Sequence, residues 1–146
     1  MRIVTRLIAI NRGRILIRQL RVVERSIQEL PARGRIRLNV LVQREMRQAS
    51  QCDFPHLYGT APEERYLPWG QGTDIGYARA LSDNPEVRLR GLALWLTVAF
   101  HETRDSPHAN LQPPHRQLLR LLRGLQEAPA PSGEGAIEQW MDSNAA

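Results

Sequence analysis

The stretch from residue 85 to residue 104 reads PEVRLRGLALWLTVAFHETR. Between Val87 and Phe100 its apolar residues fall on almost every side of a helix, a pattern typical of a helix that is buried all round. Because such a helix needs covering elements on several sides, it belongs at the centre of a fold. We therefore expect the other helices of the chain to pack around residues 85–104.

The residues that flank this stretch match the chemistry of helix ends. Asn84 is a favoured N-cap, Pro85 suits the first helical position, and Glu86 adds a negative charge to the first turn. Pro107 ends the helix, because proline cannot continue it. The start of the central helix is therefore predicted to the residue.

Residues 14–30 form the clearest periodic segment of the chain. Their apolar residues recur at steps of three and four, which is the spacing of one face of a helix. We call this set the apolar seam: Leu16, Leu20, Val23, Ile27 and Leu30. A second set follows the same steps on the opposite side of the helix. We call it the arginine stripe: Arg14, Arg18, Arg21 and Arg25.

This periodicity does not extend back to the start of the chain. If it did, Ile3, Leu7 and Ile10 would line up with Arg14 rather than with the apolar seam. We therefore expect a break at residues 11–13. Residues 2–10 would then form a separate short helix or a strand.

The segment after the apolar seam supports two interpretations. Residues 35–42 alternate between apolar and polar side chains, as in a half-buried strand, whereas residues 38–46 carry a helical pattern. We favour a helix over residues 40–49 and leave residues 35–39 undecided.

The remaining segments are shorter. Residues 51–73 contain six prolines and glycines, too many for a long regular element, so we expect a loop layer there. A short helix capped by Thr73 or Asp74 follows. An amphipathic helix is expected over residues 115–127, and residues 129–146 have the composition of a flexible linker and tail.

These segments predict a mainly α, compact helical domain of about four to five helices with a loop layer rich in proline and glycine. The domain would cover residues 1–128, with a basic amino-terminal region over residues 1–50. The alternative is an α+β fold with a small sheet from residues 3–9 and 35–42.

The charge is distributed very unevenly along the chain. Residues 1–50 contain twelve arginines and three glutamates, a charge of +9, whereas the remainder carries −4, for a total of +5. Such asymmetry indicates an anionic partner, such as nucleic acid or an acidic protein surface.

Composition also limits the class of protein. Cys52 is the only cysteine, so no internal disulfide can form, and we expect a cytoplasmic protein of bacterial type. The longest uncharged apolar run, Gly91 to Phe100, is about half the length of a membrane-spanning helix. We therefore expect no membrane span.

From these observations we expect a non-enzymatic accessory or regulatory protein, without cofactor or metal, that binds an anionic macromolecule and above all nucleic acid. Arginines of the amino-terminal region would contact several phosphates, so binding would weaken with salt. No zinc-finger, RRM or KH motif is visible, and a helix-turn-helix over residues 14–50 is only a loose possibility, because the connecting segment is long and rich in arginine. The candidate binding residues are Arg14, Arg18, Arg21, Arg25, Arg33, Arg35 and Arg37.

Two other functions are alternatives. The apolar seam could pair with another helix, which would make the chain a protein adaptor or a homo-oligomer. His101 and Asp105 share one helical face, with Glu102 beside them, so a small metal-dependent hydrolase could use these three residues. His108 or His115 would then supply a further ligand.

Two more clusters of residues have a structural explanation as well as a functional one. Cys52, Asp53 and His56 are close enough in sequence to suggest a nucleophile or a metal site, but a lone cysteine is more commonly a small buried apolar group. Glycines within residues 70–76 could cradle a phosphate, although the P-loop lysine is absent. We attribute these glycines to tight packing.

Overall fold

The computed structural model describes residues 2–51, 69–105 and 109–127. These residues form five α-helices and one short 3-10 helix, together with short turns. No strand occurs among them. A mainly α, compact helical domain is thus confirmed, and the α+β alternative is wrong, because residues 3–9 and 35–42 are helical. The helices are α1 (Arg2–Glu29), α2 (Ala32–Gln51), α3 (Trp69–Ala80), α4 (Pro85–Asp105), η2 (Ala109–Leu111) and α5 (Gln112–Gln126).

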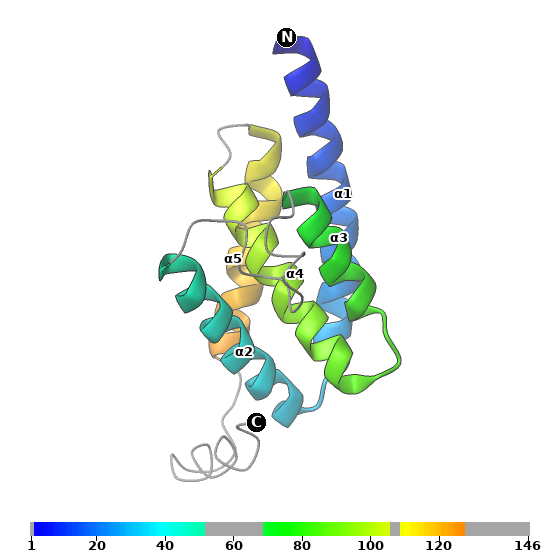
Figure 1. Cartoon of the computed structure of the whole chain (residues 1–146), viewed down its shortest axis with the longest axis vertical. Helices are drawn as coiled ribbons and strands as arrows, with labels where there is room; N and C mark the ends of the chain where they lie inside the picture. Colours follow the sequence, from blue (N-terminus) through cyan, green and yellow to red (C-terminus); the bar gives the residue numbers. More distant parts are fainter. Residues whose placement is uncertain (1, 52–68, 106–108, 128–146) are drawn as a thin grey trace.

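Helix α4 is the central element, as its sequence predicts. It packs directly against α2, α3 and α5 and lies among them in Figure 1. Residues 91–99 are all buried, and Trp95 is completely inaccessible. The N-cap is also confirmed, because Asn84 Oδ1 accepts hydrogen bonds from the backbone N–H groups of Glu86 (3.0 Å) and Val87 (3.3 Å).

Helix α1 runs without interruption from residue 2 to residue 29, so the expected break at residues 11–13 and the separate element over residues 2–10 are wrong. Gly13 is buried and continues the spacing of the apolar seam backward. A Cβ atom at Gly13 would lie 2.7 Å from the carbonyl oxygen of Asn110. This glycine therefore lets η2 approach the helix and does not end it.

The apolar seam packs into the core of the same chain. Its first four residues are at most 4% exposed, and Leu30 is partly buried against the core. Helix α1 packs against α3, α5 and η2, and it reaches α4 mainly through long side chains. Its amino-terminal end extends beyond the ends of the other helices (Figure 1).

Helix α2 covers both the segment predicted as helix and the undecided residues 35–39. Leu38 and Val42, one turn apart, are both buried, and α2 packs against α4. The helical pattern prevails over the alternating one because a helix buries both of these side chains on one face.

Helix α3 begins at Trp69, inside the predicted loop layer, and the expected cap at Thr73 or Asp74 is wrong. A Cβ atom at Gly72 would lie 3.2 Å from Val98 Cγ1, and one at Gly76 only 2.7 Å from the backbone nitrogen of Trp95. These glycines therefore allow α3 to pack closely on α4. The rest of the predicted layer, residues 52–68, lies outside the described residues.

Helix α5 begins a few residues before the predicted start at residue 115. Pro113 and Pro114 fill its first turn, where proline is tolerated because those N–H groups have no helical partner. Leu118 and Leu125 are buried on its inner face. The predicted linker and tail, residues 129–146, lie outside the described residues.

Candidate nucleic-acid interface

The arginine stripe lies on the side of α1 opposite the apolar seam, and all four of its residues are exposed. At about 100° and 1.5 Å per residue, the four positions fall within a sector of about 60° and extend about 16 Å along the helix. One side of α1 is therefore packed in the core, while the other presents four guanidinium groups to solvent.

No member of the arginine stripe has its guanidinium group in an ion pair or hydrogen bond with the part of the chain that is described. Glu24 and Glu29 are exposed on the same helix; Glu24 lies beside the stripe, whereas Glu29 follows Arg25 by one turn near its edge. Neither glutamate forms an ion pair with the stripe among the described residues. Contacts with the described residues thus leave the positive charge of the stripe unneutralised.

The three candidate residues on α2 differ from the stripe. Arg33 is exposed in the first turn, whereas Arg35 is half-buried. Both terminal nitrogens of Arg37 bind the carboxylate of Glu86 on α4. Because Arg37 is engaged within the fold, the freely exposed candidates are the stripe and Arg33.

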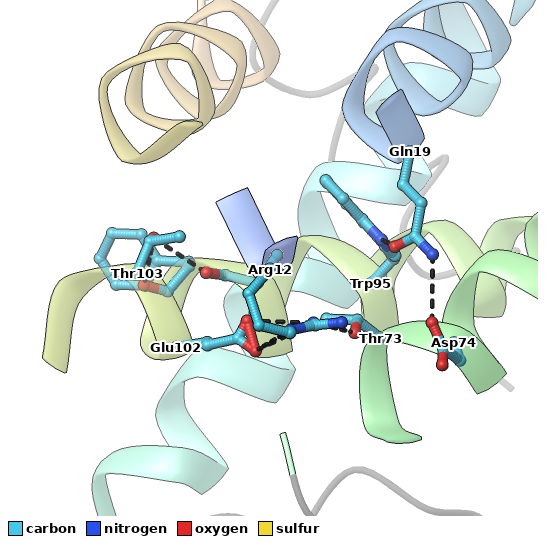
Figure 2. A network of polar contacts seen from close by, with 9 residues as sticks. Arg12, Gln19, Thr73, Asp74, Trp95, Glu102 and Thr103 are labelled. Carbon is cyan, nitrogen blue, oxygen red and sulfur yellow. Dashed lines mark hydrogen bonds and ion pairs between the residues drawn. The ribbon is translucent and has the colours of Figure 1, made fainter. Parts of the chain in front are cut away.

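An ion pair that the sequence did not reveal fixes α1 against the bundle. Arg12 Nη2 lies 3.0 Å from Glu102 Oε1 and 3.1 Å from Oε2, and it also donates to Thr73 Oγ1 at 3.0 Å (Figure 2). The two side chains are only 19% and 9% exposed. Three helices, α1, α3 and α4, are joined at this point.

Gln19 makes a second link of the same kind. Its side-chain oxygen accepts a hydrogen bond from Trp95 Nε1 at 2.8 Å, and its amide nitrogen donates to Asp74 Oδ1 at 3.1 Å (Figure 2). By register, Gln19 and Arg12 share one flank of α1, next to the apolar seam. Together they fix the rotation of α1 and so the direction in which the arginine stripe points.

The environment of Glu102 explains why this carboxyl needs a partner. Burial raises the pKa of Glu102 above its ordinary value, and the neighbouring Arg12 guanidinium opposes that shift without cancelling it. The charged form of Glu102 is therefore costly in this position, and Arg12 is the group that stabilises it.

Sequence reasoning missed Arg12 and Gln19 as positioning residues. The available signal was their spacing, because two polar residues seven apart on the flank of an apolar seam face a neighbouring helix. Their partners are far away in the chain, so the sequence alone does not identify them.

Two residues of the alternative hydrolase, His101 and Glu102, can be placed in the fold. His101 and Glu102 are buried on α4, and Glu102 is held by Arg12. Thr103 Oγ1 lies 2.9 Å from Nδ1 of His115 and links α4 to α5. Among the described residues, no group of three or more histidine, cysteine or acidic side chains could hold a metal ion. The structure does not describe His108, Cys52, Asp53 and His56, or the side chain of Asp105.

The apolar seam was also a candidate for pairing with a second copy or another protein. Leu16 and Val23 are completely buried, and Leu20 and Ile27 nearly so, by other helices of the same chain. The folded chain therefore offers no free seam to a partner, and this basis for an oligomer is wrong.

No known protein family, curated protein or solved structure significantly matches the chain. None of the described helices combines the length and the apolar character needed to cross a membrane.

Proposed function

We propose that this chain is a non-enzymatic accessory or regulatory protein that binds nucleic acid through the arginine stripe of α1. The observation that carries the proposal is the row of four exposed guanidinium groups, none of them paired within the described residues. Like charges held this close repel one another, and a row of phosphates offsets that repulsion while releasing bound counterions.

The proposed contacts go to phosphates rather than to bases. Arginine forms two parallel hydrogen bonds with a phosphate and keeps its charge at any physiological pH. If all four arginines contact duplex DNA, the logarithm of the binding constant should fall with the logarithm of salt concentration with a slope of about −3 to −4.

The test compares two triple variants that remove the same charge. R14Q/R18Q/R21Q neutralises most of the stripe, whereas R116Q/R120Q/R123Q neutralises three exposed arginines of α5. Affinity for fluorescently labelled nucleic acid is measured by anisotropy across a salt series. The stripe variant should lose about tenfold or more in affinity at about 0.1 M salt, and its salt slope should become shallower by about 2 to 3.

The α5 variant is the matched control, because it changes the net charge equally without touching α1. It should bind within about threefold of the parent chain, since net charge acts more weakly than direct phosphate contacts. Equal losses in the two variants would assign binding to net charge and contradict the role of the stripe. No binding by the parent chain at low salt would disprove the proposed function.

A further inference from the structure

The shape of the arginine stripe restricts the kind of nucleic acid that can bind it, given the proposed function. Its guanidinium groups stand on the outer face of one unbroken helix, at axial steps of about 4.5 to 6 Å. As far as the described residues show its surroundings, the stripe is thus a convex ridge and not a channel. A single strand is usually bound in a channel, whereas a ridge of helical width, about 10 to 12 Å, matches the major groove of B-form DNA.

The composition of α1 also disfavours a single strand. Proteins that bind single strands supply aromatic side chains on which unpaired bases stack. Residues 2–29 contain no Phe, Tyr, Trp or His, so the helix that carries the arginine stripe has no such platform. What α1 offers is charge and hydrogen-bond donors at regular intervals, which suits a paired backbone.

The attachment of α1 to the bundle adds a third argument. The contacts of Arg12 and Gln19 hold the helix in a fixed rotation, and the apolar seam is buried behind it. The positions from which the arginine side chains project are therefore fixed before binding, although each exposed side chain still loses rotamer freedom when it binds. A row of fixed positions favours a stiff partner whose phosphates are also regularly spaced.

We propose that the arginine stripe binds double-stranded DNA, with α1 at the mouth of the major groove and its arginines reaching the phosphates on either side of the groove. Duplex RNA fits less well, because the major groove of an A-form helix is deep and narrow. Because the arginines contact phosphates and not base edges, base preference should be weak.

The experiment measures the affinity of the full chain for four probes at one salt concentration. They are a mixed-sequence DNA duplex, its separated strands, an RNA duplex of the same sequence, and anionic phosphatidylserine vesicles. The DNA duplex should bind about tenfold or more tightly than either separated strand, and more tightly than the RNA duplex. A second duplex of shuffled sequence should bind within about threefold.

Equal or tighter binding of single strands or of RNA would overturn the inference while leaving the proposed function intact. Binding of vesicles without binding of any nucleic acid would overturn both. The stripe variant R14Q/R18Q/R21Q should lose the preference for the duplex, and circular dichroism checks that it is folded. R14K/R18K/R21K keeps the charge and should retain most of the affinity, because lysine still binds phosphate as a point charge.

Discussion

At the residue scale, Arg12 shows how one arginine of a cationic segment becomes structural. Arg12 lies two residues before Arg14, yet that step turns it from the exposed face toward the bundle. There it meets Glu102, whose buried carboxyl has a raised pKa. A buried ion pair adds little net stability, but removing one partner is costly because the other charge stays buried.

Replacing Arg12 with methionine should therefore destabilise the fold by about 3 kcal/mol or more, because Glu102 loses its only described counter-charge. Glu102→Gln should cost less, since Arg12 is the more exposed partner and can reach water. In urea unfolding of the parent, both single variants and the double variant, the coupling should be about 1 to 3 kcal/mol.

Arg14→Met is the matched control for this experiment, because Arg14 is exposed and unpaired within the described residues. It should change the free energy of unfolding by less than about 0.5 kcal/mol. Strict additivity of the Arg12 and Glu102 substitutions would show that the pair is not energetically coupled.

At the element scale, glycine has two different roles in these helices. Gly13, Gly76 and Gly91 lie where another backbone comes close, and a Cβ atom at Gly91 would sit 2.4 Å from the backbone nitrogen of Ala80. Gly124 in α5 has nothing within 4 Å of its Cβ position. The first three permit close packing, whereas the last only weakens its helix.

Gly91→Ala should destabilise the protein by about 1 to 3 kcal/mol, because the new methyl group meets backbone atoms of α3 that cannot rotate away. The same substitution at Gly124 should stabilise it by up to about 0.5 to 1 kcal/mol, since alanine is the better helix former and space is open. Thermal unfolding of both variants checks the opposite signs. A similar loss of stability in both variants would contradict the difference in packing between Gly91 and Gly124.

The sequence could predict the parts of the fold that depend on local patterns, but not those that depend on contacts between distant segments. Helix α4 and the apolar seam follow from local patterns, because a cap or a spacing of three and four lies within one segment. The break expected at residues 11–13 was wrong because a change in the register of the apolar residues does not interrupt α1, and Gly13 within it allows the contact with Asn110, far along the chain. Helix α3 was predicted to start late for the same reason, since its glycines face α4.

The candidate interface could likewise be predicted only in part. The periodicity of residues 14–30 alone separates the arginine stripe from the apolar seam. By contrast, the pairing of Arg37 with Glu86 and of Arg12 with Glu102 depends on tertiary packing between distant helices. The spacing of Arg12 and Gln19 indicates that Arg12 faces a neighbouring helix, but no local pattern identifies the partner of either arginine.

At the scale of the whole molecule, buried ionisable groups couple stability to pH. Burial raises the pKa of Glu45 on α2 to about 7, against the opposing effect of Arg44 and Arg90. Glu102 is shifted in the same direction. The pKa of His115 is lowered, first by burial and then by the charge of Arg104. This shift has the opposite effect, because a lowered pKa makes the free energy of unfolding rise with pH.

For Glu45 the sign follows from the protons bound in each state. Between the unfolded value of 4.5 and the folded value of about 7, the folded chain keeps a proton that the unfolded chain releases. The free energy of unfolding therefore falls as the pH rises through this window, by at most about 3 kcal/mol. The contribution of Glu45 is fully present below pH 4.5 and is lost above about pH 7.

Glu45→Gln removes this pH dependence, because glutamine resembles the protonated carboxyl but never ionises. The variant should match the parent near pH 4.5 and be more stable by about 2 kcal/mol at pH 8, as measured by urea unfolding across that range. Glu24→Gln, an equal change of charge on the exposed side of α1, should give a difference that varies little with pH. Taking differences from the parent cancels the titration of Glu102 and His115, so parallel stability curves for the parent and Glu45→Gln would contradict a half-buried Glu45 with a raised pKa.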